Sequence, residues 1–206
     1  MPERDPEAAV ARARDAETIL LPKNGNEVGA KDWLEKVADI EIPTFKPRAL
    51  TAKSEGRYFR RLRDPEIVDG VQRGEGDVGY LGMDKFQTWK PRGLALEYVA
   101  DVEGCDFILA ALAENVDAVR ARLDAREPVS VVTSHAAWLG DIALDRGWEL
   151  NVRQVSGATE AFAEYVDMIA DLRVTGNSLA ANGLEEFMHL DSVHLGQLYR
   201  EPVDTP

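Results

Sequence analysis

Residues 167–183 read Asp-Met-Ile-Ala-Asp-Leu-Arg-Val-Thr-Gly-Asn-Ser-Leu-Ala-Ala-Asn-Gly, a pattern that predicts a strand, a tight turn and the start of a helix. The apolar run breaks at Thr175-Gly176, and a helical pattern begins at Ser178. Gly176 lets the backbone approach a ligand closely, and the first amides of a helix have no partner within it. With the hydroxyl groups of Thr175 and Ser178, these amides favour a phosphate site. The alternative interpretation is an ordinary strand-turn-helix corner in which Ser178 is only an N-cap.

Carboxylates accompany this turn. On a strand, Asp167 and Asp171 are four residues apart and point to the same face. Carboxylate oxygens there can accept hydrogen bonds from sugar hydroxyl groups or hold Mg²⁺. A second possible phosphate corner is Ser156-Gly157-Ala158-Thr159-Glu160, which opens a helical pattern with Ser156 or Thr159 as its cap.

The composition is that of a globular protein. The 206 residues suffice for one large domain or two small ones. With 45% hydrophobic and 30% charged residues the chain is not disordered, and no apolar run approaches the roughly 18 residues that span a bilayer. The N-terminus is charged and has no apolar signal segment, so we expect a cytoplasmic protein. The single cysteine, Cys105, cannot form an internal disulfide and is interpreted as a small buried residue.

The net charge of −13 disfavours nucleic acids and anionic membranes as partners, because both repel an acidic protein. Against this background, four arginines stand close together at positions 57, 60, 61 and 63. On a strand they alternate faces, so only some of them can converge on one anionic ligand. The alternative is an exposed edge strand whose charges protect it from pairing with other chains.

Strand and helix patterns alternate along most of the chain. Residues 2–17 have no strong apolar stripe and are interpreted as a solvated amphipathic helix or a loose arm, with the folded body beginning at Thr18. Alternation of this kind predicts a mostly parallel sheet flanked by helices, with ligands bound beyond the carboxyl ends of its strands. The expected strands cover residues 19–23, 76–82, 95–102, 105–112, 129–133 and 150–155, and the main helices follow residue 26 and cover residues 64–74, 115–125 and 136–147.

Glycines and histidines mark further positions of interest. Residues 76–82 contain three glycines, and glycine within a strand often marks close approach to a ligand or to another element. His135 ends a strand in a loop suited to ligand binding, where it is either a general base or a structural, helix-capping residue. His189 and His194 are expected at the surface.

Six motifs follow one another in a fixed order. They are Leu21-Pro22-Lys23-Asn24-Gly25, Arg63-Asp64-Pro65, Gly74-Glu-Gly-Asp77-Val-Gly79-Tyr-Leu-Gly82-Met-Asp84, Glu103-Gly104-Cys105, the turn 156–160 and the segment 167–184. In this order, over roughly residues 18–195, they resemble the catalytic ATP phosphoribosyltransferase of histidine biosynthesis, in its short form.

The resemblance implies an α/β fold with two lobes of the periplasmic-binding-protein type II, joined by crossing strands, with the active site in the cleft between the lobes. Residues 1–17 are then an N-terminal arm. Lobe I comprises residues 18–98 and 186–206, and lobe II comprises residues 99–185 with the loop for phosphoribosyl pyrophosphate.

The resemblance also implies a glycosyltransferase that joins N1 of ATP to C1 of phosphoribosyl pyrophosphate, with Mg²⁺ neutralising the released pyrophosphate. No covalent or obligatory base residue is expected in such a reaction. Lys23, Arg63 and Asp84 are implied to contact ATP or the leaving group. The residues implied to bind phosphoribosyl pyrophosphate are Asp167, Asp171, Thr175, Gly176, Asn177, Ser178, Ser156, Gly157, Thr159 and Glu160.

Two partners are implied as well, a second copy of the chain in a homo-oligomer and a separate regulatory subunit similar to histidyl-tRNA synthetase. Some family contacts are missing: Asn26 stands where an arginine is expected, and Ser134-His135-Ala136 replaces a Lys-aromatic-Pro sequence. Two other interpretations therefore stay open. One is a diverged phosphoribosyltransferase with another base as acceptor, and the other is a non-catalytic two-lobed ligand-binding module.

Overall fold

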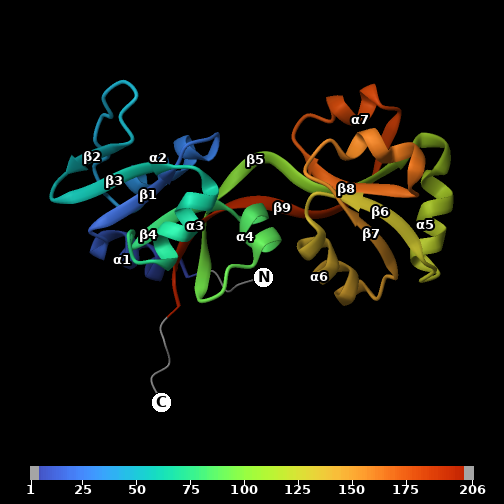
Figure 1. Ribbon diagram of the computed structural model, residues 1–206, viewed down its shortest axis with the longest axis horizontal. Coiled ribbons are helices and arrows are strands. Elements are labelled where there is room, and N and C mark those ends of the chain that lie inside the picture. The colour runs from blue at the N-terminus through green and yellow to red at the C-terminus, as the bar shows by residue number, and fades with distance from the viewer. Residues whose placement is uncertain (1–4, 202–206) are drawn as a thin grey trace, which may run out of the picture. The chain divides into compact units, whose positions relative to one another are not determined.

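The structure of the chain, a computed structural model, describes residues 5–201, without the side chains of residues 102–104 (Figure 1). The chain forms two compact units, residues 1–102 with 194–206 (unit 1) and residues 103–193 (unit 2). The expected division into lobe I (residues 18–98 and 186–206) and lobe II (residues 99–185) remains a prediction. Residues 1–4 of the expected N-terminal arm and residues 202–206 of lobe I lie outside the described residues. The strands follow the order β2-β3-β1-β4-β9-β5-β8-β6-β7.

In unit 1, β1 pairs in parallel with β3 and β4, whereas β2 and β9 pair antiparallel with β3 and β4. Apolar residues of β1 and of α2 form its core with Phe59 and Tyr80. The elements of this unit are α1 (Pro6–Asp15), β1 (Thr18–Pro22), α2 (Asn26–Lys36), β2 (Thr51–Ser54), β3 (Arg57–Leu62), α3 (Asp64–Gln72), β4 (Val78–Gly82), α4 (Met83–Trp89), and parts of β5 (Leu94–Leu112) and β9 (Leu184–Arg200).

In unit 2, β6 pairs in parallel with β7 and β8, and β5 pairs antiparallel with β8. One face of this sheet carries an apolar cluster that includes Ile108, Ile169 and Leu179. Besides the remaining parts of β5 and β9, the elements are η1 (Ala113–Asn115), α5 (Val116–Asp124), β6 (Val129–Thr133), α6 (Ala136–Arg146), β7 (Leu150–Gln154), η2 (Thr159–Tyr165), β8 (Met168–Arg173) and α7 (Asn177–Ala181). The expected α/β class is confirmed, but the sheet is mixed and not mostly parallel, because β2, β5 and β9 pair antiparallel with β3, β8 and β4.

The N-terminal segment contributes to the core of unit 1. Helix α1 begins after Asp5, whose side chain accepts a hydrogen bond from the N–H of Ala8 at 2.9 Å. Ala9 and Ala13 are fully buried in the same cluster as Ile19 and Leu21. Small side chains let the helix approach closely without a large apolar stripe, so unit 1 begins before Thr18, where the sequence places the start of the folded body.

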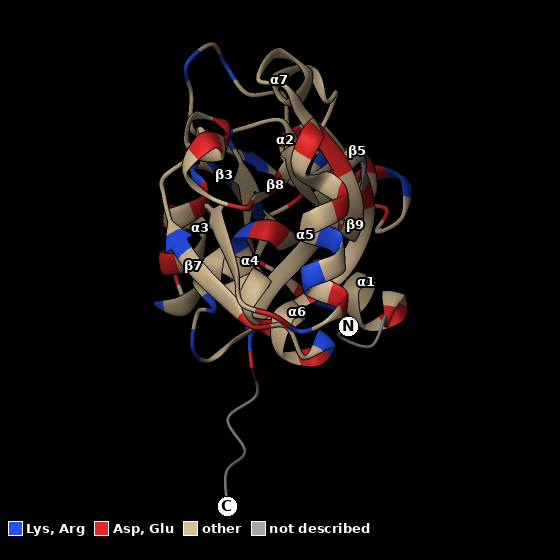
Figure 2. Ribbon diagram, turned by 90° about the vertical axis from the view of Figure 1, so that its right-hand side faces the viewer, with Lys and Arg blue, Asp and Glu red and all other residues tan. Residues whose placement is uncertain are grey.

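The interpretation of the arginine-rich segment as an edge strand is wrong. Strand β3 lies between β2 and β1, and β2 is the edge. Its arginines are compensated by protein groups: Arg61 pairs with Glu27 at 2.6 Å, and Arg57 donates to the carbonyl oxygen of Arg14 at 2.8 Å. Figure 2 shows acidic and basic residues interspersed along the helices, as in the pair Lys31–Glu27 of α2. Two of the arginines on β3 are thus occupied by protein groups.

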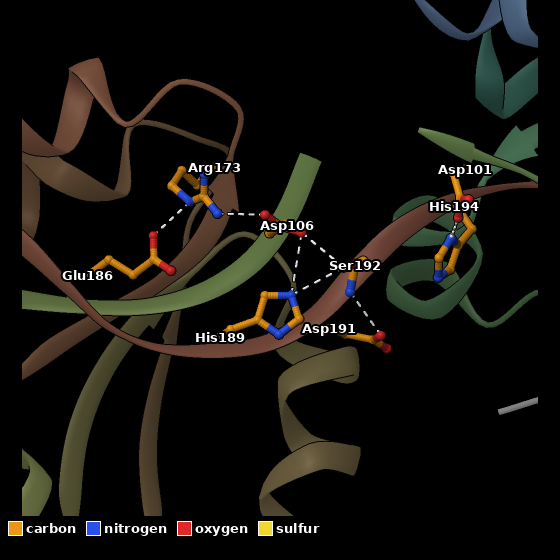
Figure 3. Close-up of polar contacts among 8 residues, drawn as sticks. All are labelled: Asp101, Asp106, Arg173, Glu186, His189, Asp191, Ser192 and His194. Carbon is orange, nitrogen blue, oxygen red and sulfur yellow. Dashed lines mark hydrogen bonds and ion pairs between the residues drawn. The ribbon is translucent and has the colours of Figure 1, made fainter. Parts of the chain in front are cut away.

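Two expectations about strands and histidines also fail. The segments 95–102 and 105–112 form one strand, β5, and Cys105 within it is only half-buried. The tail forms β9, where His194 is buried, with its Nδ1 2.9 Å from Oδ1 of Asp101 (Figure 3). The expectation of a surface position for His194 is therefore wrong, because β9 lies between β4 and β5 in the sheet. His189 has a half-exposed side chain.

A strand glycine sets the approach of α3 to the sheet. A Cβ atom at Gly79 of β4 would lie 2.5 Å from Cγ2 of Ile67 and 3.1 Å from Cγ2 of Val71. Such distances are too short for packed carbon atoms, so the close approach that this glycine marks is to another element of the fold.

We predict that Gly79→Ala lowers the free energy of unfolding by about 1–3 kcal/mol, because the added methyl group overpacks the contact with α3. Gly140→Ala in α6 is the matched control: its Cβ meets nothing within 4 Å. It should raise stability by up to about 1 kcal/mol, since alanine favours a helix more than glycine does. Urea unfolding followed by circular dichroism measures both, and equal midpoints for wild type and Gly79→Ala would contradict this packing.

Candidate functional site

A pocket of about 190 Å³ lies where β8 runs into the following loop, within unit 2. Its wall combines apolar groups with charged and hydroxyl-bearing side chains. They come from β5, η2, β8 and α7, and the polar ones are Glu160, Asp171, Arg173, Thr175 and Ser178. The turn that the sequence singles out is thus part of a concave site.

Gly176 makes this turn possible. It adopts φ 74° and ψ 0° at the N-cap of α7, a left-handed conformation that favours glycine. The N–H of Asn177 lies 3.4 Å from Oγ1 of Thr175, and the buried side chain of Leu179 anchors α7 to the core. Thr175, Asn177 and Ser178 are exposed, so their polar groups can reach a ligand.

Asp171 projects into this pocket from β8, and buried groups orient it. Its Oδ2 accepts a hydrogen bond from Oγ1 of Thr159 at 2.5 Å, and its Oδ1 accepts one from the N–H of Leu172 at 2.8 Å. Thr159 is fully buried, and Nε2 of the buried His135 lies 4.0 Å from Oδ1. Hydrogen bonds to neighbouring protein groups therefore fix the carboxylate of Asp171, and the residue remains part of the pocket wall.

His135 packs as a core residue. Its ring contacts that of Phe107 edge to face, with 5.6 Å between the ring centres. It occupies the N-cap position of α6, but its side chain makes no capping hydrogen bond there. This burial accords with the structural alternative for His135, without the helix-capping role.

The structure does not bring Asp167 to the pocket. It precedes β8, at the end of the strand opposite to the loop, and its Oδ2 accepts hydrogen bonds from both the N–H and the hydroxyl group of Ser130 at 2.7 Å. Its Oδ1 pairs with Nη1 of Arg122 at 2.7 Å. Burial raises its pKa, but the hydrogen bonds from Ser130 and Arg122 outweigh burial, and the pKa lies below its ordinary value. A binding role for Asp167 is not supported by this geometry, because its carboxylate already joins β8 to β6 and α5.

The second corner, residues 156–160, contributes in part. Ser156 and Gly157 are exposed and do not line the pocket, whereas Glu160 does. Ala158 is left-handed, with φ 49°, and directs the chain into η2. Thr159 reaches the site indirectly, through its hydrogen bond to Asp171.

Unit 1 places a second polar set at one edge of its sheet. Lys23, Arg63 and Asp84 follow the parallel strands β1, β3 and β4, whose carboxyl ends lie at the same edge. Lys23 and Arg63 are exposed. The backbone N–H of Lys23 donates a hydrogen bond to the carbonyl oxygen of Leu62 at 2.7 Å. Asp84 is buried and pairs with Lys85 at 2.9 Å.

Asp64, the first residue of α3, belongs to this edge too. Its Oδ1 accepts a hydrogen bond from the side-chain amide of Asn24 at 2.8 Å. Burial raises the pKa of Asp64. The positive charge of Lys85 partly offsets this shift, and the negative charge of Asp84 adds to it. Two neighbouring carboxylates, Asp64 and Asp84, thus lie at this edge beside the cations Lys23, Arg63 and Lys85.

Comparison with known proteins identifies the family. The family model for ATP phosphoribosyltransferase matches residues 63–195, which include the pocket of unit 2 and two of the three residues named in unit 1. The chain belongs to the ATP phosphoribosyltransferase family. Family membership confirms the resemblance read from the sequence and its enzyme class.

Relatives agree with this assignment. The ATP phosphoribosyltransferase of Staphylococcus carnosus is 26% identical over 169 residues, which cover 81% of this chain and 73% of that protein. The one from Symbiobacterium thermophilum is 28% identical over 174 residues, covering 81% and 77%.

Solved structures show the fold. The ATP phosphoribosyl transferase (HisG:HisZ) complex from Thermotoga maritima superposes with a TM-score of 0.61 at 16% identity, covering 89% of this chain and 87% of that one. The Bordetella pertussis BvgS VFT2 domain gives a TM-score of 0.51 at 8% identity, with 97% and 87% covered. A histidine kinase sensor domain with similarity to periplasmic binding proteins gives a TM-score of 0.50 at 11% identity. The match covers 92% of this chain and 84% of that one. The expected periplasmic-binding-protein type of fold is confirmed.

Within residues 5–201, none of the helices has the length and apolar character needed to cross a membrane.

We predict that Thr159→Val weakens binding of ribose 5-phosphate about tenfold, because valine fills the same volume but donates no hydrogen bond to Asp171. Thr159→Ser keeps the hydroxyl group and should bind within about twofold of wild type. Isothermal titration measures both, with circular dichroism as the test of folding. Wild-type affinity in Thr159→Val would show that Thr159 does not position Asp171.

Proposed function

We propose that the chain transfers the 5-phosphoribosyl group of phosphoribosyl pyrophosphate to N1 of ATP with release of pyrophosphate, the first step of histidine biosynthesis. The observation that carries this proposal is a pocket in which the Thr175–Ser178 turn adjoins an oriented Asp171, inside the segment that matches the family. A turn with exposed amides and hydroxyl groups suits a phosphate, and a carboxylate suits the hydroxyl groups of the adjoining ribose.

Unit 2 binds the sugar donor in this proposal. Gly176, Asn177 and the hydroxyl groups of Thr175 and Ser178 receive the 5-phosphate. Asp171 accepts hydrogen bonds from the ribose hydroxyl groups, and Glu160 contributes a second carboxylate to the same pocket. Thr159 acts through Asp171, and Ser156 with Gly157 shapes the corner before it.

Unit 1 binds ATP or the departing pyrophosphate in this proposal. Lys23 and Arg63 are exposed cations at the carboxyl ends of adjacent parallel strands. Guanidinium and ammonium groups bind phosphate oxygens through charge-assisted hydrogen bonds, and arginine does so with two parallel bonds. Asp84, on the next strand of the same edge, is the acidic member of this set.

The reaction needs no proton acceptor at its start. N1 of adenine attacks with a lone pair, the bond from C1 to the pyrophosphate oxygen breaks, and the electron pair of that bond leaves with pyrophosphate. Positive charge develops on the ribose ring and negative charge on the leaving group. Positioning of the two substrates and electrostatic stabilisation therefore supply the catalysis, with Asp171 and Glu160 beside the ribose.

Mg²⁺ completes the proposal as the ion that neutralises pyrophosphate when bound. Among the side chains that the structure describes, those of residues 5–101 and 105–201, no cluster of three or more His, Cys, Asp or Glu is arranged to hold a metal. Mg²⁺ is usually bound through substrate phosphates and one or two carboxylates. Asp64 and Asp84 are the carboxylates that suit this role in unit 1. Burial raises the pKa of Asp64, and the negative charge of Asp84 adds to that shift.

The proposal includes two protein partners and a cytoplasmic location. The Thermotoga maritima protein with this fold was solved as a HisG:HisZ complex. Its superposition with this chain covers most of the length of each of the two proteins compared. We therefore include a separate regulatory subunit similar to histidyl-tRNA synthetase, together with a homo-oligomer of this chain.

A second candidate is a phosphoribosyltransferase with another base as acceptor. It is favoured by residues 134–136, where the family's lysine is replaced and His135 is buried instead of offering a cation to a ligand. Such a change alters specificity more easily than it alters the fold.

We predict that the purified chain releases pyrophosphate from phosphoribosyl pyrophosphate in the presence of ATP and Mg²⁺, alone or with the regulatory subunit. Reactions without ATP or with EDTA are the controls. Binding of phosphoribosyl pyrophosphate without turnover under either condition would refute ATP as the acceptor and favour the second candidate. An absence of binding would instead favour a ligand-binding module without catalysis.

We predict that Thr175→Ala combined with Ser178→Ala abolishes binding of phosphoribosyl pyrophosphate, because two of the hydroxyl donors to its phosphate are lost. The fold should remain intact, since both side chains are exposed. Thr51→Ala combined with Ser54→Ala on β2 removes the same groups in unit 1 and serves as the control. Unchanged affinity of the loop variant in isothermal titration would refute the phosphate assignment.

A further inference from the structure

The pocket of unit 2 is lined by more acidic than basic side chains, and the loop after β8 does not compensate this charge by itself. Two of its lining residues, Glu160 and Asp171, are acidic, and one of the described lining residues, Arg173, is basic. A phosphate group on a sugar carries a charge of about −1.5 to −2 at neutral pH. Backbone amides and hydroxyl groups provide only partial positive charges, so two carboxylates and a phosphate require a full cation nearby.

Arg173 is placed to be that cation. It ends β8, directly before the loop, and shares the pocket wall with Thr175, Gly176 and Ser178. Its Cδ passes 3.9 Å from the position that a Cβ at Gly176 would take. The stem of the arginine thus runs alongside the turn that receives the phosphate.

Two carboxylates hold the guanidinium in place (Figure 3). Nη2 lies 2.5 Å from Oδ2 of Asp106, the residue opposite Arg173 on β5, and Nε lies 2.7 Å from Oε2 of Glu186 on β9. Asp106 is held in turn: its Oδ1 accepts a hydrogen bond from the hydroxyl group of Ser192 at 2.9 Å, with Nε2 of His189 at 3.4 Å. These contacts fix the orientation of Arg173 before any ligand arrives.

The guanidinium keeps donors for a further partner. It has five N–H groups, and its contacts with Asp106 and Glu186 involve Nη2 and Nε. Nη1 has no hydrogen-bond partner among the described residues. The contact of Nε with Glu186 is close, yet it is not directed as a hydrogen bond, and the side chain remains 29% exposed. An anion in the pocket can therefore bind Arg173 without displacing both carboxylates.

We propose that Arg173 is the cation of this pocket and binds the phosphate group of the sugar donor, while Asp106 and Glu186 position its guanidinium at the pocket's edge. This inference rests on the proposed function, which assigns the sugar donor to the pocket of unit 2. A purely structural role is the competing explanation, in which Arg173 only joins β8 to β5 and β9.

The two roles predict different signs for substitutions of the two partners. Arg173→Gln should weaken binding of ribose 5-phosphate by on the order of 10- to 100-fold, the range for loss of a charge-assisted hydrogen bond to an anion. Asp106→Asn keeps a hydrogen-bonding side chain but removes a charge that competes for the guanidinium. It should bind ribose 5-phosphate as tightly as wild type or several-fold more tightly. A purely structural ion pair would instead lose affinity equally in both variants.

Isothermal titration of the full chain with ribose 5-phosphate measures these affinities, with Arg173→Lys as the conservative variant. Lysine keeps the charge but not the fork of donors, so it should recover part of the loss. Arg146→Gln, an exposed arginine of α6 outside the pocket, is the matched control and should stay within about twofold of wild type. Circular dichroism establishes the folding of each variant, and if Arg173→Gln does not fold, Arg173→Lys and Asp106→Asn decide the question by their opposite directions.

Two outcomes would overturn the inference while the proposed function stands. One is wild-type affinity in Arg173→Gln, and the other is an equal loss in Asp106→Asn and the Arg173 variant that folds. If wild type binds neither ribose 5-phosphate nor phosphoribosyl pyrophosphate, the assignment of the sugar donor fails, and this inference fails with it.

Discussion

The pairing register of β5 with β8 determines what the pocket of unit 2 contains. It sets Ile108 opposite Asp171 and Asp106 opposite Arg173. Since side chains alternate along a strand, these four residues share one face, which also carries the apolar cluster around Ile169 and Leu179. A slip by one residue would turn Asp171 and Arg173 to the other face and bring apolar residues into the pocket. Burial of the apolar cluster therefore keeps both polar residues in place.

An acidic chain that binds polyanionic substrates must control where its positive charge is available. Several arginines are already paired with carboxylates: Arg61 with Glu27, Arg122 with Asp167, and Arg173 with Asp106. Lys23 and Arg63 are exposed at the carboxyl edge of unit 1. Pairing fixes an arginine's geometry and lowers its net attraction for distant anions, so a paired arginine favours ligands that fit its remaining donors. An exposed lysine is less selective.

The sequence predicted local elements well and long-range burial poorly. The strand β6 and the turn at Gly176 follow from a short apolar run and from a glycine before a helix, both of which are local signals. The full length of β5 was missed because Glu103 and Gly104 interrupt its apolar pattern, and the burial of His194 depends on strands far away in the chain. Asp167 was assigned to the ligand because spacing reveals a common face but not its partners, Ser130 and Arg122.

A similar fold at 11% identity occurs in a histidine kinase sensor domain, so the fold alone does not make an enzyme of this chain. What distinguishes it is a small set of side chains on a shared framework. In unit 2 these are constrained, because a hydrogen bond joins the buried Thr159 to Asp171 and Gly176 occupies a left-handed conformation that favours glycine. In unit 1, Lys23 and Arg63 are exposed and can be replaced with little cost to the fold. In the proposed function, recognition of the sugar donor is thus built into the packing of unit 2, whereas recognition of the acceptor depends on exposed residues that can change more freely.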